Sequence, residues 1–341
     1  MITVEHLTKR YGHVTAVSDL SFSIAPGKVT GFLGPNGSGK STTMRCIMGL
    51  DRPTSGRTTI GGVEYRKLRS PLTKVGALLD GNAFYGGRTA RTELRAIART
   101  HGISNRRVDE VLALTGLESV ADKRTKGFSL GMGQRVGIAR ALLGDPEVLI
   151  FDEPVNGLDP DGVRWVRELM RALAAQGRTV LVSSHLMSEM AQTADNLVVI
   201  GRGKLIAEGP LENFINTVEN TTVRVTGPDP HAIDAALRPL ASTLTWEAPS
   251  EAAPQGVAVV VGKTRAEIGH ALFVAGVEIH ELTEAHRSLE DVFIGLTNAS
   301  VEYPAQGSAP AQSGLQVGTP QPENNAASAP RHATPENGAQ A

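Results

Sequence analysis

The segment GPNGSGKST at residues 34–42, here called the phosphate loop, constrains the fold more than any other part of the chain. It fits the pattern G-x-x-x-x-G-K-[ST], with Gly34, Gly39, Lys40 and Ser41 at the fixed positions. A triphosphate needs several backbone N–H groups near its oxygens, and a glycine-rich loop allows the main chain to approach so closely. The loop stands between the apolar run VTGFL and the helical pattern STTMRCIMGL, so we predict a strand–loop–helix unit. Lys40 is expected to bridge the β- and γ-phosphates, and the Ser41 hydroxyl to ligate Mg²⁺.

A second motif, VLIFDEP at residues 148–154, places two carboxylates after a buried strand. In α/β sheets, ligands bind at the carboxyl ends of the strands. Taken alone, the pair Asp152 and Glu153 would simply start a loop. In a chain that also has a phosphate loop, we expect Asp152 to hold Mg²⁺ and Glu153 to orient or deprotonate the attacking water.

The order of apolar patterns predicts the architecture. Strands alternate with helices over residues 1–215, which indicates an α/β fold with a mostly parallel sheet and helices on both faces. Within this part, a helical subdomain is expected at about 80–145. From 216 to 299 the order βαββαβ plus a closing helix, SLEDVFIGLT, predicts a small α+β domain of the ferredoxin-like type. Residues 300–341 carry almost no large apolar side chains, so we expect a disordered tail.

Composition limits the function classes. The chain has 34 Lys and Arg against 35 Asp and Glu, and only 4% aromatic residues, which argues against a protein built mainly to hold nucleic acid. Its single cysteine, Cys46, fits a reducing cytosol and is expected to be a small buried hydrophobe. We find no signal-peptide pattern and no apolar run near the ~18 residues that span a bilayer. Any membrane role is therefore expected to come through a partner.

A third motif, FSLGMGQRVGIARAL at residues 128–142, lies between the first two. By itself it is a helix start with Ser129 as the N-cap. The three motifs together resemble the nucleotide-binding subunit of ATP-binding-cassette (ABC) transporters, in which the middle motif reads LSGGQ. Ser129 and Gly131 match that motif, while Leu130 and Met132 depart from it. The variant SLGM resembles drug- and antibiotic-export members of the family.

The resemblance implies a P-loop NTPase cassette with a RecA-like core, a helical subdomain and an antiparallel β subdomain. It implies that two such subunits enclose two ATP molecules. Ser129 and Gly131 of one subunit would then contact the γ-phosphate held by the phosphate loop of the other. Asp159, in NGLD at 156–159, would communicate across the dimer, and His185 of SSH would contact the γ-phosphate. The ATP-binding loop would comprise Gly34, Pro35, Asn36, Gly37, Ser38, Gly39, Lys40, Ser41 and Thr42.

Two further positions carry alternatives. Tyr11 matches the aromatic residue that stacks on adenine, and we expect it to do so here; the alternative is a half-buried strand residue. Asp80 stands where the family usually has a glutamine that ligates Mg²⁺, so it is either a metal or water contact or a plain turn residue. Arg135 and Arg140 are expected to be packing residues. The 9 histidines show no metal-ligand spacing, and we predict no structural metal.

The resemblance favours the ATPase subunit of a bacterial type 2 exporter, similar to those for daunorubicin-type drugs or bacitracin. It implies ATP and Mg²⁺ as cofactors, a separately encoded permease and a second copy of the chain as partners, and a place on the cytoplasmic face of the membrane. An importer subunit, or a soluble ABC ATPase that acts on ribosomes or DNA, remains an alternative. The small domain is expected to support the dimer.

Overall fold

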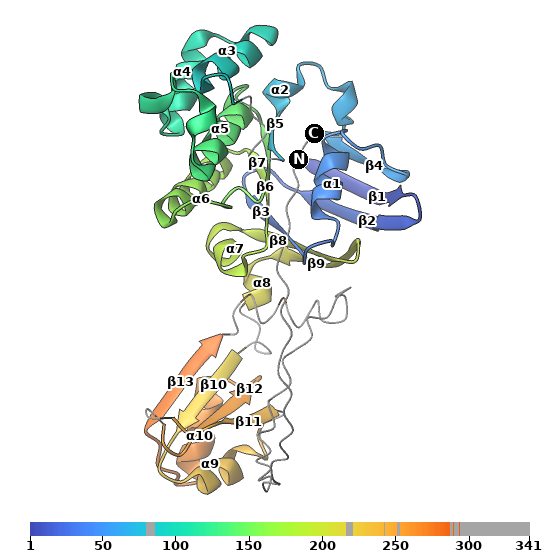
Figure 1. Ribbon diagram of the computed structural model, residues 1–341. Helices are drawn as coiled ribbons and strands as arrows, with labels where there is room; N and C mark the ends of the chain where they lie inside the picture. The colour runs from blue at the N-terminus through green and yellow to red at the C-terminus, as the bar shows by residue number, and fades with distance from the viewer. Residues whose placement is uncertain are drawn as a thin grey trace, which may run out of the picture. The chain divides into compact units, whose positions relative to one another are not determined.

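A computed structural model describes residues 1–79, 86–215, 221–241, 243–250 and 253–286, together with 289 and 293. Its largest element is a six-stranded sheet in the order β5-β6-β7-β3-β8-β9 (Figure 1). The strands are β3 (Val29–Leu33), β5 (Val75–Leu78), β6 (Val148–Asp152), β7 (Thr179–Ser184), β8 (Asn196–Gly201) and β9 (Lys204–Pro210). Neighbouring strands pair in parallel except β8 and β9. The mostly parallel sheet predicted from the sequence is confirmed.

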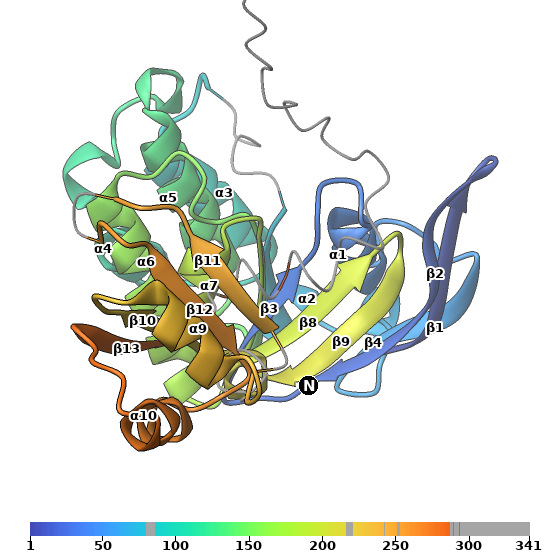
Figure 2. The ribbon, with the colours of Figure 1, turned by 90° about the horizontal axis from the view of Figure 1, so that it is seen from below.

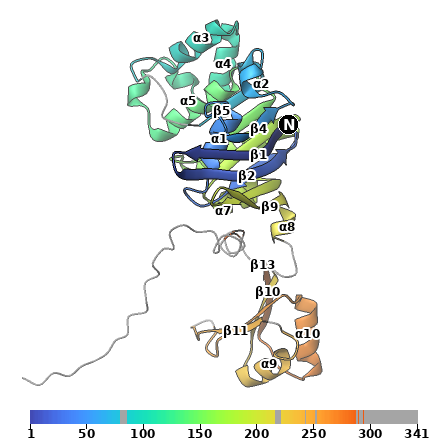
Figure 3. The ribbon, with the colours of Figure 1, turned by 90° about the vertical axis from the view of Figure 1, so that its right-hand side faces the viewer.

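A second sheet of three antiparallel strands lies beside the first (Figures 2 and 3). It consists of β1 (Ile2–Tyr11), β2 (Val14–Ile24) and β4 (Ser55–Ile60), in the order β2-β1-β4. Helix α1 (Lys40–Ile47) contacts β2, β4 and β6, so it lies between the two sheets. Its buried side chains share one hydrophobic core with Phe22 and Phe32, whose ring centroids are 5.4 Å apart. The phosphate loop therefore leads from the centre of one sheet into the space between both.

Helices cover the opposite side of the large sheet and its β5 edge. Three of them, here called the helical segment, are α3 (Ala90–Thr100), α4 (Asn105–Leu114) and α5 (Leu130–Leu142), and two more are α6 (Pro160–Ala175) and α7 (Met187–Thr193). Shorter helices and turns are α2 (Pro71–Lys74), α8 (Glu212–Ile215) and the 3₁₀ turns Tyr65–Lys67, Glu118–Val120 and Thr125–Gly127. Side chains of Thr89, Ser104, Ser129 and Asp159 cap α3, α4, α5 and α6 by accepting a backbone N–H. One hydrophobic core joins all five helices to the sheet.

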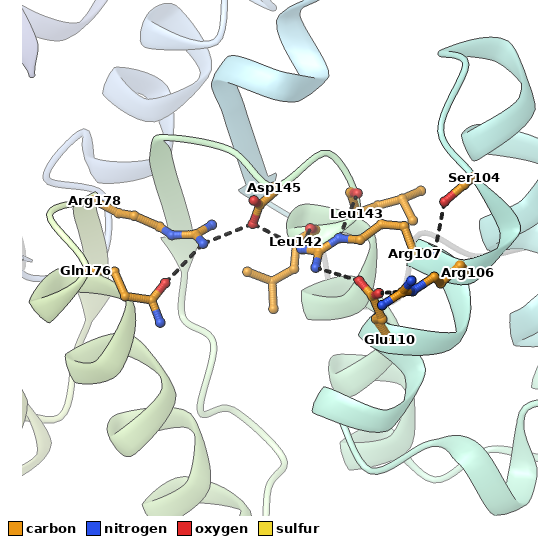
Figure 4. Close-up of polar contacts among 9 residues, drawn as sticks. All are labelled: Ser104, Arg106, Arg107, Glu110, Leu142, Leu143, Asp145, Gln176 and Arg178. Atoms are coloured by element: carbon orange, nitrogen blue, oxygen red, sulfur yellow. Dashed lines mark hydrogen bonds and ion pairs between the residues drawn. The ribbon is translucent and has the colours of Figure 1, made fainter.

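A polar network ties the helical segment to the sheet (Figure 4). Arg107 of α4 donates to the carbonyl of Leu142 at 2.9 Å, at the end of α5, and to Asp145 Oδ1 at 3.2 Å. The same carboxylate oxygen lies 2.9 Å from Nη2 of Arg178, just before β7. Asp145 is in the left-handed conformation (φ 52°) that turns the chain from α5 toward β6. Helix α4 is thus fixed to the end of α5 and, through Asp145, to the start of β7.

Two arginines of α5 have the packing roles that the sequence predicts. Arg135 donates to the carbonyl of Thr115 at 2.9 Å, and its guanidinium lies 4.3 Å from the ring centroid of Trp165. Arg140 lies 3.5 Å from the buried carboxylate of Glu93. Both side chains therefore link α5 to neighbouring helices.

Residues 221–286 contain a four-stranded antiparallel sheet with two helices on one face (Figure 3). The elements are β10 (Thr221–Thr226), α9 (Pro230–Leu237), β11 (Thr243–Glu247), β12 (Val257–Val261), α10 (Arg265–Val274) and β13 (Glu281–His286). The strand order β11-β12-β10-β13 is that of a ferredoxin-like unit, as expected from the βαββαβ pattern. We call these residues the small domain.

Several predictions fall on residues outside those described. They are Asp80, the predicted tail at 300–341, and the closing helix SLEDVFIGLT apart from Leu289 and Phe293, which are helical. Over the part of the chain that the structure describes, no helix is both long and apolar enough to cross a bilayer.

Candidate active site

Two positions of the phosphate loop accommodate only glycine. Gly39, at the start of α1, has a φ of 103°, and a Cβ there would lie 2.6 Å from the carbonyl oxygen of Ala16. A Cβ on Gly34 would lie 2.6 Å from the carbonyl oxygen of Ile200. These close approaches explain why the two fixed glycines of the motif are required here.

The loop opens onto a cavity of about 610 Å³, a volume suited to a mononucleotide. Its lining combines the loop with the ends of β6 and α5 and comprises Ala16, Asn36, Gly37, Ser38, Gly39, Lys40, Ser41, Thr42, Leu79, Leu130, Gln134, Asp152, Glu153 and Asn156. The structure thus brings together the phosphate loop and the two carboxylates, which lie far apart along the chain. A larger hollow of about 1080 Å³, between β1, β2 and β8, is lined by none of the predicted site residues.

Lys40 extends back along the loop. Its Nζ donates to the carbonyls of Gly34 at 2.6 Å and Pro35 at 3.3 Å, and the residue is only 7% exposed. Burial lowers the pKa of the Lys40 ammonium, while the negative charges of Glu153 and Asp152 act in the opposite direction. A buried ammonium is suited to an anionic ligand, because phosphate oxygens restore the charge stabilisation that burial removes.

The second half of the site comes from the ends of β6 and β7. These strands pair in parallel with Asp152 opposite Ser183, so their carboxyl ends meet at one edge of the sheet. The Nδ1 atom of His185 lies 2.8 Å from Oε2 of Glu153, and the His185 side chain is 47% exposed. The pair combines a carboxylate with an imidazole that reaches solvent, which is suited to water activation.

The third motif reaches the cavity only in part. Leu130 and Gln134 line the cavity, whereas Ser129 and Gly131 do not. Ser129 Oγ accepts the backbone N–H of Met132 at 3.2 Å, as the N-cap of α5. Asp159 caps α6 in the same way, accepting from Gly162 at 2.9 Å.

Tyr11 lies outside the cavity lining and is 46% exposed. Its hydroxyl donates to Asp51 Oδ2 at 2.7 Å, and Lys9 Nζ lies 4.7 Å from the ring centroid. Burial and Asp51 raise the pKa of the phenol. The ring is therefore held in place at its hydroxyl end by Asp51, which follows the C-terminal end of α1.

Comparison with known proteins gives the family. A model described as "ABC transporter" matches residues 17–156, and a domain of unknown function matches residues 221–290. The chain is 43% identical over 217 residues to the bacitracin transport ATP-binding protein BcrA of Bacillus licheniformis, covering 63% of this chain and 71% of that protein. It is 35% identical over 305 residues to an uncharacterized ABC transporter ATP-binding protein, YcbN, of Bacillus subtilis (strain 168), covering 88% and 98%. The chain belongs to the ABC transporter ATP-binding proteins.

A solved structure supports the fold of this ABC cassette. The dimeric post-hydrolysis state of an ATP-binding cassette bound to ADP and Pi has a TM-score of 0.57 and 25% identity, over 62% of this chain and 99% of that one. The family membership makes the chain an ATPase. The ABC cassette fold expected from the sequence is confirmed.

Two polar residues that bond near the end of β6 were not predicted from the sequence. Ser183 of the motif SSH and Gln134 of the third motif both bond to the residues around Glu153. Both residues stand inside motifs that the sequence already marks as functional, and this location was the signal that could have identified them. Their partners, however, lie 19 or more residues away in the sequence, and only the fold brings them into contact.

Proposed function

We propose that this chain is the ATP-hydrolysing subunit of an exporter, which powers a separately encoded permease that carries an antibiotic or another hydrophobic substrate. The observation that supports the cargo class most strongly is the 43% identity to the bacitracin transport protein. The ATPase part rests on the phosphate loop and Glu153, which line one cavity, and on His185, which contacts Glu153.

In this proposal the polar groups in and around the cavity have separate tasks. Lys40 neutralises the β- and γ-phosphates, and main-chain N–H groups of the phosphate loop hold their oxygens. Glu153 accepts the proton of the attacking water. His185 donates to Glu153 or to the γ-phosphate, and its exposed ring allows either. Tyr11 offers an aromatic face to the adenine.

The residues present fit Mg²⁺. Within the described ranges no three His, Cys, Asp or Glu side chains form a metal cluster, whereas Ser41 and Asp152 both face the cavity with oxygen donors. A magnesium ion that takes most of its ligands from phosphates and water needs few protein ligands of this kind. Such an ion would neutralise charge that develops on the γ-phosphate. Asp80, outside the described residues, is a third proposed ligand.

We also propose a composite site between two copies. Ser129 and Gly131 lie away from the cavity of their own chain, so a second copy would have to supply this pair to the γ-phosphate. Asp159, at the start of α6, would carry the state of one site to the other. A monomer would then hydrolyse ATP poorly.

The remaining proposals concern organisation. The chain would comprise a cassette at 1–215, an accessory domain at 216–299 that supports the dimer, and a tail at 300–341. It would lie at the cytoplasmic face of the membrane, held there by the permease.

The test is co-purification of the Glu153→Gln variant from membranes in mild detergent with Mg-ATP. We expect a polytopic membrane protein in about 1:1 ratio, because the variant should bind ATP, fail to turn it over and stay in the closed dimer. The control is the double variant Lys40→Ala/Glu153→Gln, which should lose the ATP-dependent part of the capture. Recovery of ribosomal proteins or nucleic acid instead would overturn the exporter proposal, and rapid multiple turnover by Glu153→Gln would overturn the mechanism.

A further inference from the structure

The main chain of Glu153 has an unusual conformation. Its φ of 51° lies in the left-handed region, which a residue with a Cβ adopts only where its surroundings impose it. This conformation turns the chain abruptly at the end of β6, so that Asp152 and Glu153 present their carboxylates to different partners. The groups that fix this turn also fix the direction of both carboxylates.

Ser183 is the first of these groups. Its hydroxyl donates to Asp152 Oδ1 at 2.5 Å and accepts the backbone N–H of Glu153 at 3.0 Å. Ser183 is fully buried. Its position opposite Asp152 in the β6–β7 pairing places the hydroxyl between the two acidic residues. A hydroxyl is the smallest side-chain group that can donate to a carboxylate and accept from an amide at once.

Gln134 is the second group. Its Nε2 donates to the carbonyl oxygen of Glu153 at 3.1 Å, and the side chain is 5% exposed. Gln134 lies in the second turn of α5, the helix capped by Ser129. The two groups therefore bond to opposite sides of the same residue, Ser183 to its N–H and Gln134 to its C=O.

We infer that Ser183 and Gln134 are positioning residues for ATP hydrolysis: together they hold the left-handed main chain of Glu153, and Ser183 also fixes the carboxylate of Asp152. This inference rests on the proposed roles of Glu153 in water activation and of Asp152 toward Mg²⁺. Because Oδ1 of Asp152 accepts from Ser183, Oδ2 is the oxygen left for a metal-bound water or the ion. The charge-assisted bond at Oδ1 prevents rotation of the carboxylate about its last torsion angle.

The two residues should give different kinetic effects, because Ser183 contacts both acidic residues and Gln134 contacts only Glu153. In Ser183→Ala we expect kcat to fall by about 10- to 100-fold and the Mg²⁺ concentration for half-maximal activity to rise by a similar factor, as for other groups that support metal ligands. In Gln134→Met, which keeps the length and helix preference of the side chain, kcat should fall while the Mg²⁺ dependence stays unchanged.

A binding measurement without turnover isolates the effect on Asp152. In the Glu153→Gln background, ATP affinity is measured by titration with Mg²⁺ and again with EDTA. Adding Ser183→Ala should remove most of the gain in affinity that Mg²⁺ gives and leave the EDTA value unchanged. Ser183→Thr, which restores the hydroxyl, should restore much of that gain. Adding Gln134→Met should leave the gain in affinity that Mg²⁺ gives unchanged.

The matched control is Ser184→Ala. Ser184 is the next residue of β7 and equally buried, but its hydroxyl accepts the backbone N–H of Leu186 at 2.9 Å and contacts neither acidic residue. Its variant should melt near the same temperature as Ser183→Ala and keep the normal Mg²⁺ dependence. Equal Mg²⁺ effects in the two variants would overturn the inference, because loss of any buried hydroxyl of β7 would then suffice. If Glu153→Gln is inactive and Ser183→Ala retains full activity, the inference fails and the proposed function stands. Rapid multiple turnover by Glu153→Gln would instead overturn the proposed role of Glu153 in water activation, on which this inference rests.

Discussion

Arg107 and Asp145 form an ion pair, 3.2 Å between Nη2 and Oδ1, across the junction of the helical segment and the sheet. The same Arg107 side chain donates to the carbonyl of Leu142 and lies 3.4 Å from that of Leu143, where α5 ends. Such end carbonyls lack helical partners, and a cationic donor satisfies them. One side chain therefore closes α5 and joins α4 to the turn before β6.

Replacement of Arg107 should destabilise the protein more than replacement of its neighbour. We expect Arg107→Ala to lower the free energy of unfolding by about 1–3 kcal/mol, since buried carbonyls lose a charged donor. Arg106→Ala is the control, because that side chain is 89% exposed and pairs only with Glu110 in the described structure. Its cost should stay below about 0.5 kcal/mol. Urea unfolding of both variants measures the difference, and equal midpoints would contradict the role given to Arg107.

Two roles of Ser129 can be separated by substitution. Ser129→Ala removes the N-cap of α5 and should cost about 1 kcal/mol of stability, as well as most ATPase activity. Ser129→Asp keeps a capping oxygen and should restore the stability. It should not restore activity, because a carboxylate has no proton to donate and repels a γ-phosphate. The measurement is thermal melting beside ATP turnover, and an active Ser129→Asp variant would show that Ser129 only caps the helix.

The single cysteine should resist modification in the folded protein. Burial raises the pKa of the Cys46 thiol to about 11, so at pH 8.5 little thiolate forms. We expect slow reaction with iodoacetamide in the native state and fast reaction in urea. The unfolded thiol releases its proton near its ordinary pKa of about 8.5, so stability should fall as pH rises from there toward 11. Cys46→Ala should lessen this fall, and equal alkylation rates in native and unfolded protein would contradict the prediction.

Tyr11 should contribute to ATP affinity mainly through its ring. Tyr11→Ala should weaken ATP binding by about 10-fold or more, since stacking of a base on an aromatic side chain is worth about 1–3 kcal/mol. Tyr11→Phe keeps the ring and loses only the bond to Asp51, so we expect a change of a few-fold. The measurement is the dissociation constant for ATP of each variant. A Tyr11→Ala variant with normal affinity would make Tyr11 a strand residue without contact to the base.

The sequence was most informative where chemistry depends on neighbouring residues. The phosphate loop needs glycines at fixed spacing, and Gly34 and Gly39 have the close contacts that this spacing implies. The carboxylates at Asp152 and Glu153 follow a run of apolar residues that makes a buried strand recognisable. The period and spacing of apolar residues also predicted the ferredoxin-like order of strands and helices in the small domain.

Contacts between distant segments could not be predicted in this way. Nothing local to Ser183 indicates that its strand pairs with β6 in the register that places it opposite Asp152. Likewise, Arg107 is one of several arginines in a helical pattern, and only the packing of α4 against the end of α5 gives it partners. For Tyr11 the two sources differ. Its match to the family motif predicts a contact with the nucleotide, while the structure places it outside the cavity lining.

The pairing of β6 with β7 limits how the chain can change in length. Successive side chains of a strand point to opposite faces, so one residue inserted into either strand would turn Ser183 away from Asp152. The exposed turn at the end of α6, at residues 175–177, carries no such restriction. Deletion and insertion scanning across 148–184 should therefore give tolerated changes around the end of α6 and none within the two strands. Engineered fusions or reporter peptides belong in that exposed turn.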